Sequence, residues 1–365
     1  MELKIVDFIK THSNWEELLT SSPYNLTIKR DGKLVLFKYN QINSDFNEEI
    51  CCEARGLILE EETWRVVRMA FKKFFNLGES FAAQLDWDTA VATEKIDGSI
   101  ISVFFYDGKW RIATNSTIDA FKAELGGIGP YKTFGELFES VLPLSTFENY
   151  NKHRCWTFEL VSPYNKVVID YPETKVYLLS IRDMYSLEEL DLEAVEMIAD
   201  ANGITVPKRY DLNNEADYRQ LVEQMPEGHE GIVVRDAMGR RVKIKTLLYF
   251  QMHKAKNNGI ITLERIVDLI LKNDDEEFLS YFVEYRPKFS HIRNVREKIL
   301  SKIEEINLLV KNYSSKKEIA LDNSIPNWEK RFYFNAFDKK ENNLKPRDWC
   351  KLIEMWEAAH NESIE

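Results

Sequence analysis

The sequence predicts an α+β fold, in which a domain of antiparallel sheets is followed by an all-α C-terminal domain. Residues 1–250 contain three segments with the pattern of β-hairpins, and helical segments lie between them. Repeated hairpins favour antiparallel sheets over a doubly wound parallel sheet. After about residue 250 the hairpin pattern is absent, and apolar residues recur at helical spacing. We therefore expect two domains, residues 1–250 and residues 251–365.

Glycine-containing turns mark the hairpins. The predicted strand pairs are residues 26–30 with 33–37, 100–106 with 109–113, and 231–235 with 241–245. Asp31-Gly32 and Asp107-Gly108 suit two-residue turns, in which both positions need a positive φ. The third turn lies around Gly239. Because strands joined by such short turns must be neighbours, each pair is expected to be antiparallel.

Helices are predicted where apolar residues recur at helical spacing behind a capping motif. Residues 1–20 fit a helical segment with a capping box at residues 13–16, and further boxes begin at Thr133 and Ser186. Asn202-Gly203 is expected to end the helix that follows Ser186. In the C-terminal part, helical spacing covers residues 262–271, 276–285, 292–310 and 349–359.

Composition excludes several classes of protein. With 365 residues, of which 44% are hydrophobic and 30% charged, the chain can bury a large core. No apolar run approaches the length needed to span a bilayer, and the N-terminus lacks the basic-then-apolar order of a secretion signal. The four cysteines show no metal-binding spacing and the six histidines are scattered, so a zinc site has little support. We expect a monomer in the reducing cytoplasm of a bacterium or of a phage-infected host cell.

Charge is distributed unevenly along the chain. The net charge of -11 argues against indiscriminate binding of polyanions. Residues 1–250 hold 29 basic and 40 acidic side chains, whereas residues 251–365 hold 20 of each. Within the second part, residues 281–350 carry 15 basic and 10 acidic side chains. A long anionic ligand would therefore need a local basic face.

The candidate nucleophile is Lys95, in the stretch Thr93-Glu94-Lys95-Ile96-Asp97-Gly98-Ser99. A lysine attacks only when its amine loses a proton near neutral pH, which requires partial burial or neighbouring positive charge. Asp97 can cap the turn and Gly98 lets the backbone turn tightly, so Lys95 is held at the mouth of the following strands. Taken alone, Lys-x-Asp-Gly fits a solvated lysine beside a turn better than a nucleophile.

Five short motifs in a fixed order favour the nucleophile over the solvated lysine at Lys95. They are Glu53-Ala54-Arg55-Gly56, Phe71-Lys72-Lys73-Phe74-Phe75-Asn76, Lys95-Ile96-Asp97-Gly98, Thr157-Phe158-Glu159-Leu160 with residues 175–182, and Glu230-Gly231-Ile232-Val233-Val234 with Lys243-Ile244-Lys245. In this order they resemble the nucleotidyltransferase motifs of covalent ligases and capping enzymes, and most closely the phage-type RNA ligase 1 family, which repairs tRNA. The resemblance covers residues 50–250 and implies an antiparallel-sheet nucleotidyltransferase (ATP-grasp-like ligase) domain. For the helical end, only the size and class match.

The resemblance implies an ATP-dependent RNA ligase. Lys95 would attack the α-phosphorus of ATP and keep AMP as a phosphoramide, AMP would pass to an RNA 5′-phosphate, and a 3′-hydroxyl would then displace it. Lys243 and Lys245 would favour the unprotonated amine of Lys95 and stabilise the transferring phosphoryl group. Residues two apart on a strand share a face, so both ammonium groups point the same way. Alternatively, Lys243 and Lys245 could lie on a solvent-exposed face of the strand without contacting a ligand.

Carboxylates and an arginine complete the expected chemistry. Glu230 is expected to be a ligand of Mg²⁺ or Mn²⁺, because these hard cations favour a few carboxylates plus phosphate oxygens. Glu159 is expected to contact the ribose and to assist the metal. Arg55 would steer the ribose or the RNA 5′-phosphate with its planar fork. Glu159 could instead be a structural carboxylate on a strand, with its hydrogen bonds made within the protein. Arg55 could instead form a salt bridge to Glu53.

Further residues are expected to hold the nucleotide. Lys73 would reach the ATP phosphates, Phe75 and Tyr249 would stack on or line the nucleoside, Glu94 would read the adenine edge, and Gly98 would allow close approach. Aromatic residues in such a run also fit a protein core. At the position where relatives often carry a basic residue near the nucleotide, this chain has Asn115, which can donate a hydrogen bond but brings no charge.

Other functions remain open from the sequence. The helical domain is assigned to recognition of RNA, such as a broken tRNA loop, with basic residues between Arg286 and Arg347 on the RNA backbone. A DNA ligase or a capping guanylyltransferase would use the same chemistry, but both usually append a β-barrel domain. A non-catalytic RNA-binding or nucleotide-sensing protein could retain the pocket. A Schiff-base lysine enzyme is a further class, although nothing else here fits a carbonyl substrate.

Overall fold

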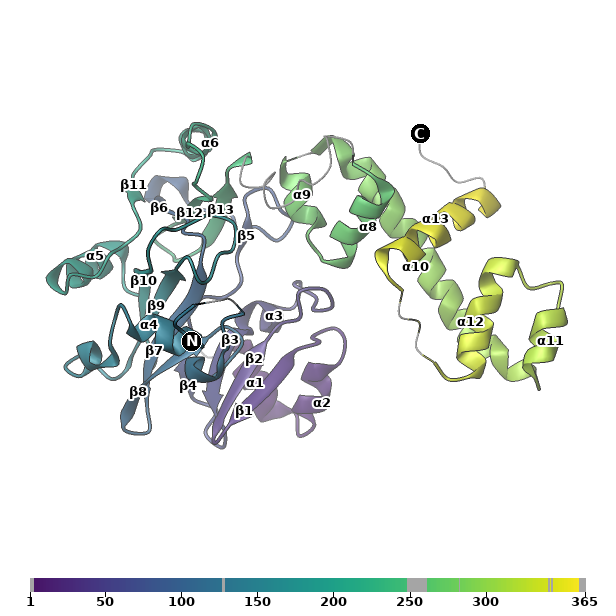
Figure 1. The fold of residues 1–365 in the computed structure, drawn as a ribbon, viewed down its shortest axis with the longest axis horizontal. Helices are drawn as coiled ribbons and strands as arrows, with labels where there is room; N and C mark the ends of the chain where they lie inside the picture. The colour runs from purple at the N-terminus through teal and green to yellow at the C-terminus, as the bar shows by residue number, and fades with distance from the viewer. Residues whose placement is uncertain are drawn as a thin grey trace. The chain divides into compact units, whose positions relative to one another are not determined.

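The computed structural model describes residues 3–126, 129–247, 261–281, 283–340, 342 and 344–360. The chain divides into two compact units, Met1–Lys256 and Asn257–Glu365. The first unit carries the sheets and the second carries helices (Figure 1).

The first sheet of the N-terminal unit is antiparallel and has the strand order β1-β2-β3-β4. Its strands are β1 (Thr27–Asp31), β2 (Leu34–Lys38), β3 (Arg55–Glu60) and β4 (Val66–Arg68). Three helices accompany it: α1 (Lys4–Thr11), α2 (Trp15–Thr20) and α3 (Glu49–Glu53). Ile5, Leu19 and Phe37 belong to the core between these helices and the sheet, and none of the three is exposed. This packing fixes the position of β3, which starts at Arg55.

Two further sheets carry most of the remaining motifs. One has the order β10-β9-β7-β8, with β7 (Ser99–Tyr106), β8 (Lys109–Thr114), β9 (Arg154–Val161) and β10 (Lys175–Asp183). The other has the order β11-β6-β12-β13-β5, with β5 (Phe75–Asn76), β6 (Val91–Glu94), β11 (Arg209–Tyr210), β12 (Gly231–Arg235) and β13 (Arg241–Lys245). The β13–β5 pair is parallel, whereas the other ladders are antiparallel. The connections contain α4 (Phe134–Glu139), α5 (Leu192–Ala201), α6 (Glu215–Glu223), η1 (Trp87–Thr89), η2 (Ala120–Lys122) and η3 (Leu144–Phe147).

All three predicted hairpins form, with one shift at a turn. Asp107 and Gly108 have φ of 51° and 76°, as a two-residue turn with two positive φ values requires. In the first hairpin, by contrast, Asp31 lies in β1 opposite Leu34, so the turn is Gly32-Lys33. Both strands are therefore shifted by one residue along the chain relative to the prediction, and Gly32 takes the positive φ of 61°.

The capping predictions have mixed outcomes. The Thr133 side chain accepts from Glu136 N at the start of α4, as predicted, and α5 ends at Asn202 with Gly203 at φ 64°. The box at residues 13–16 is wrong, because the residue before α2 makes no side-chain capping bond. The box at Ser186 is also wrong, because α5 begins after Asp191, whose carboxylate accepts from Ala194 N.

The C-terminal unit is helical throughout its described residues. Its elements are α8 (Leu263–Leu271), α9 (Asp275–Tyr281), η4 (Val283–Tyr285), α10 (Arg286–Leu309), η5 (Val310–Asn312), α11 (Lys316–Leu321), α12 (Asn327–Phe337) and α13 (Pro346–His360). The sequence did not predict α11 and α12 individually. Phe289, Val295 and Phe332 are fully buried in its core. Among the helices described in either unit, none has the length and apolar character that a bilayer crossing requires.

Candidate active site

A cavity of about 340 Å³ in the N-terminal unit gathers residues from strands that are distant in sequence. Eight residues singled out from the sequence line it: Arg55, Glu94, Lys95, Gly98, Asn115, Glu159, Lys243 and Lys245. They come from β3, β6, β9 and β13 and from the turns that follow β6 and β8. The fold therefore brings residues of all five sequence motifs to one cavity, the second motif through Phe71 and Phe74.

Strand pairing positions the lysines. The Lys95 backbone N–H donates to Gly231 O at 2.8 Å, and Gly231 lies opposite Lys245 in the β12–β13 ladder. Gly231 has φ +142°, and a Cβ there would lie 2.0 Å from the carbonyl oxygen of Ile244. Only glycine fits this position, because any side chain would push β13 away from the lysine loop. Alternation along β13 then places Lys243 and Lys245 on the same face.

A buried carboxylate bridges the nucleophile and the Lys-x-Lys pair. Lys95 Nζ lies 2.6 Å from Glu230 Oε2, and Lys245 Nζ lies 3.5 Å from Glu230 Oε1. The Glu230 side chain is 3% exposed and that of Lys95 is 23% exposed. The sequence predicted cations crowding Lys95, but the structure places a carboxylate in contact with both ammonium groups. Glu230 can therefore accept a proton from Lys95 when the amine attacks.

Glu159, on β9, is a second buried carboxylate near Lys95, and it lines the cavity. Burial raises the pKa of Glu159 to about 8, with the charge of Lys95 acting in the opposite direction and that of Glu230 adding to the rise. Across the described part of the chain, no cluster of three or more histidine, cysteine, aspartate or glutamate side chains could hold a metal ion. A hard cation would then rely on these two carboxylates together with substrate oxygens, which suits Mg²⁺ or Mn²⁺.

The raised pKa of Glu159 predicts a pH dependence of stability. Between its ordinary value of 4.5 and about 8, folded Glu159 keeps a proton that the unfolded chain releases, so stability falls as pH rises through this window. We expect Glu159→Gln to remove part of this fall, on the order of a few kcal/mol. Urea unfolding at pH 5, 6.5 and 8 measures it, with exposed Glu148→Gln as the matched control. An equally steep fall in the Glu159 variant would contradict the assignment.

Arg55 lines the cavity, and in the part of the chain that the structure describes it forms no ion pair with a carboxylate. Its Nη1 is buried and makes no hydrogen bond, and its guanidinium lies 5.1 Å from the centroid of the Phe74 ring. The alternative of a salt bridge to Glu53 is wrong, because Glu53 accepts from Ile5 N at 3.0 Å and pairs with Lys72 at 3.0 Å. Arg55 is therefore held by an aromatic ring and presents an unused donor.

Lys73 and Phe75 do not line this cavity, contrary to prediction. The Lys73 ammonium lies 4.8, 4.4 and 5.2 Å from the ring centroids of Tyr39, Phe46 and Phe75. Phe75 is buried in this aromatic cluster, so it is a core residue and does not contact the cavity. From the same run, Phe71 and Phe74 line the cavity instead. Tyr249 lies outside the described residues.

The turn after Lys95 is fixed by its aspartate. Asp97 Oδ2 accepts from Val168 N at 2.8 Å and from Ile169 N at 2.7 Å, which ties the turn to the loop between β9 and β10. Gly98 does not take a positive φ; a Cβ there would lie 2.5 Å from the carbonyl oxygen of Leu160. The lack of a side chain at Gly98 therefore allows β9 to pack closely against this turn.

A buried arginine lies behind Asn115. Arg68 is fully buried, donates to Asn115 Oδ1 at 2.9 Å and to Ser102 Oγ at 2.7 Å, and also donates to Gly56 O. Burial lowers the pKa of Arg68 to about 10. A Cβ on Gly56 would lie 2.5 Å from Arg68 Nη1, so this glycine makes room for the guanidinium. Positive charge is thus present near Asn115, although Asn115 itself has none.

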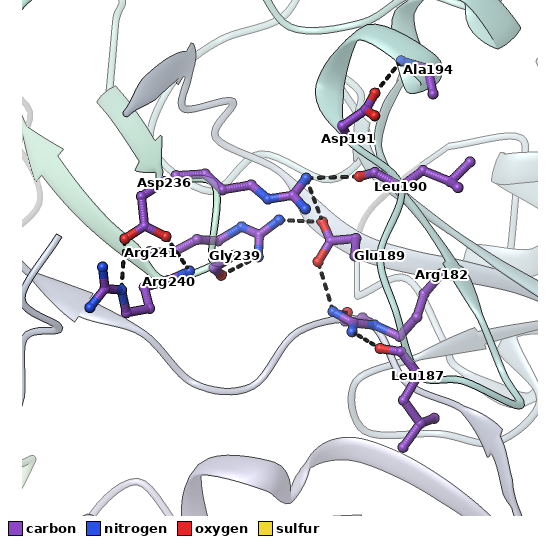
Figure 2. Close-up of polar contacts among 12 residues, drawn as sticks. Arg182, Leu187, Glu189, Leu190, Asp191, Ala194, Asp236, Gly239, Arg240 and Arg241 are labelled. Atoms are coloured by element: carbon purple, nitrogen blue, oxygen red, sulfur yellow. Dashed lines mark hydrogen bonds and ion pairs between the residues drawn. The ribbon is translucent and has the colours of Figure 1, made fainter. Parts of the chain in front are cut away.

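Three arginines surround one carboxylate at another part of the cavity wall. Glu189 pairs with Arg182 at 2.7 Å, with Arg235 at 3.5 Å and with Arg241; Figure 2 shows the labelled Arg182 and Arg241 in contact with it. Burial alone would raise the pKa of Glu189, but Arg241, Arg182 and Arg235 outweigh it and lower the pKa. Arg235 and Arg241 also line the cavity. The sequence reasoning missed this cluster, although Arg235 and Arg241 flank the predicted third turn.

Glu189 connects two sheets, because Arg182 lies on β10 whereas Arg235 and Arg241 lie on β12 and β13. Its side chain is 6% exposed, so Glu189→Ala would leave buried arginines without their shared partner. We expect a loss of about 3–5 kcal/mol in the free energy of unfolding. Denaturant titration measures it, and exposed Glu188→Ala is the control. Equal free energies of unfolding for the two variants would show that the ion pairs of Glu189 do not stabilise the contact between the two sheets.

Comparisons with known proteins show which family the chain belongs to. A family model described as RNA ligase matches residues 53–259, more than half of the chain. The chain is 27% identical over 312 residues to an RNA ligase of Rhodothermus phage RM378, covering 69% of this chain and 70% of that protein. It is 29% identical over 170 residues to RNA ligase 1 of bacteriophage TS2126, covering 43% of this chain and 41% of that protein.

A solved structure shows the same fold. An archaeal ATP-dependent RNA ligase matches with a TM-score of 0.50 and 14% sequence identity, over 83% of this chain and 82% of that one. This likeness supports the α+β nucleotidyltransferase fold predicted from the hairpins and motifs. Because the family model covers more than half of the sequence, the chain belongs to the phage-type RNA ligase family.

Proposed function

We propose that this protein is an ATP-dependent RNA ligase that joins RNA 5′-phosphate and 3′-hydroxyl ends through a lysyl-AMP intermediate. The observation that carries the proposal is the partly buried amine of Lys95, in contact with Glu230 and lining one cavity with Lys243, Lys245 and Arg55. Membership of the RNA ligase family gives the substrate class.

In the first step, Lys95 Nζ forms a bond to the α-phosphorus of ATP, and the bond from that phosphorus to the pyrophosphate oxygen breaks. Glu230, 2.6 Å from Nζ, accepts the proton that the amine loses. Lys243 and Lys245 stabilise the charge on the transferring phosphoryl group, because both line the cavity on one face of β13.

In the second step, an oxygen of the RNA 5′-phosphate attacks the AMP phosphorus and Lys95 leaves, taking up a proton. In the third step, the RNA 3′-hydroxyl attacks the 5′-phosphorus and AMP leaves. Arg55 suits the incoming phosphate because its donor Nη1 has no protein acceptor. Glu94 and Gly98 line the cavity and are assigned to the nucleotide.

A divalent cation, Mg²⁺ or Mn²⁺, would be held by Glu159 and Glu230. It would supply charge neutralisation for the phosphates in the transferring group. The donor set fits such a cation, because Glu159 is a buried carboxylate at the cavity whose pKa is raised by burial and by the charge of Glu230. Bound metal would favour the ionised form of Glu159.

Recognition of a particular RNA, such as a nicked tRNA, is assigned to the helical unit. Several of its cations between Arg286 and Arg347 are already paired within that unit, including Arg293 with Asp275 and Lys316 with Asp338. Its excess of basic residues is therefore partly neutralised, and shape must contribute to selection of the RNA.

Transfer of label from ATP tests the proposal. The protein is incubated with ATP labelled at the α-phosphate and a divalent cation, denatured, and examined for covalently bound label; a 5′-phosphorylated RNA is then added and circular products are sought. Label from ATP followed by RNA circles supports the ligase. Preference for GTP would instead indicate capping, sealing of nicked DNA alone would indicate a DNA ligase, and absence of label would indicate a nucleotide sensor.

A further inference from the structure

A second cavity, of about 530 Å³, adjoins the first in the N-terminal unit. Its walls include Thr27 and Lys29 of β1, Lys38 of β2, and Ser116. Arg55 and Asn115 line both cavities. The two spaces therefore meet at Arg55, which is assigned to the incoming phosphate, and at Asn115. The sequence motifs gave no sign of this cavity, because Lys29 and Lys38 belong to the N-terminal hairpin outside them.

The second cavity is cationic. Lys29, Lys38 and Arg55 line it, and among the described residues no aspartate or glutamate does. Lys38 Nζ donates to Ser116 Oγ at 2.6 Å, and Lys29 Nζ donates to Ser116 O at 2.9 Å. Both ammonium groups thus converge on one residue that offers only neutral oxygens. Two cations gathered on a neutral residue leave positive charge to be neutralised by a ligand.

Strand register brings a further pair of cations together. Lys38 lies opposite Arg55 in the β2–β3 ladder, beside an irregularity in the pairing. Like charges directly opposite each other destabilise a sheet, so this arrangement costs stability unless an anion lies between them. Arg55 Nη1 is buried and has no hydrogen-bond partner, which is a second sign of an absent acceptor.

We propose that this second cavity binds the 5′-phosphorylated end of the RNA strand, with the terminal phosphate between Arg55 and Asn115 on one side and Lys38 and Lys29 on the other. This inference rests on the proposed ligase function and assigns a subsite to one of its two RNA ends. The terminal phosphate is the favoured occupant because it carries more negative charge than any other group of the RNA, whereas a 3′-hydroxyl end is neutral. Because the cavity walls carry lysines and an arginine, they favour the charged phosphate end over the neutral hydroxyl end.

Direct binding tests this subsite without catalysis. Single-stranded RNAs of one sequence, carrying either a 5′-phosphate or a 5′-hydroxyl and a blocked 3′ end, are titrated with the full-length protein by fluorescence anisotropy in the absence of ATP. We expect the 5′-phosphorylated RNA to bind more tightly. The double variant Lys29→Ala/Lys38→Ala should weaken its binding roughly tenfold and narrow the preference for the phosphate. The slope of log affinity against log salt should become shallower by about 1.4, from two contacts at about 0.7 each.

Matched variants make the outcome specific. Lys33→Ala removes an exposed lysine of the same hairpin that pairs with Glu62, and it should leave both affinities unchanged. Lys38→Arg keeps the charge and should retain most of the preference. Unchanged binding of the 5′-phosphorylated RNA in the double variant would overturn the proposal, as would equal weakening of both RNAs. Failure of the unsubstituted protein to form lysyl-AMP would overturn the ligase function and would leave the binding result interpretable.

Discussion

Replacing Lys95 with alanine should abolish covalent labelling by ATP, lowering it by roughly four to six orders of magnitude, as removal of a catalytic nucleophile does in other enzymes. The variant lacks the amine that attacks the α-phosphorus of ATP. In the unsubstituted protein this amine lies 2.6 Å from Glu230, the proposed proton acceptor. The measurement is the rate of label transfer from α-labelled ATP, followed after denaturation.

The control for this variant is Lys109→Ala, which removes an exposed lysine at the start of β8. It should label at the rate of the unsubstituted protein. Loss of the Lys95–Glu230 ion pair also leaves a buried carboxylate without one of its partners, so circular dichroism must show that the Lys95 variant is folded. A folded Lys95→Ala protein that still takes up label would assign the chemistry to another residue.

Lys243→Ala and Lys245→Ala should each slow formation of lysyl-AMP by about 10²–10³-fold. Both side chains line the cavity from one face of β13, where they can stabilise charge on the phosphoryl group as it transfers. Lys245 should show the larger effect, because it also contacts Glu230, the proposed proton acceptor, at 3.5 Å.

Single-turnover kinetics at saturating ATP separates this loss of rate from a loss of affinity. Arg240→Ala is the matched control, because Arg240 lies in the turn before β13 and pairs with Asp236. Rates within a few-fold of the unsubstituted protein for both lysine variants would mean that the Lys-x-Lys pair has a structural role only.

Much of the fold could be predicted from the sequence, because hairpins and helices are specified locally. Alternating apolar residues and a glycine turn were sufficient to place all three hairpins. The two wrong capping boxes show the limit of such patterns. Ser186-Leu187-Glu188-Glu189 has the letters of a helix start, but Glu189 is instead used by three arginines from other strands.

The candidate site was predictable where residues lie within recognisable motifs. Lys95, Glu159, Lys243 and Lys245 reach one cavity because adjacent strands and alternation bring them there. Contacts between distant segments were not predictable in the same way. The placement of Lys73 among aromatic rings and the convergence of Lys29 and Lys38 on Ser116 depend on tertiary packing, which no local pattern encodes.

Peptide mapping of the adenylylated protein is the most direct test of lysine-linked AMP. The unsubstituted protein is incubated with ATP and Mg²⁺, digested without acid that would hydrolyse a phosphoramide, and sequenced by tandem mass spectrometry. We predict a single AMP adduct, on the peptide that contains Lys95. An adduct on a different side chain, or unmodified Lys95 in protein that has consumed ATP and released pyrophosphate, would contradict the account.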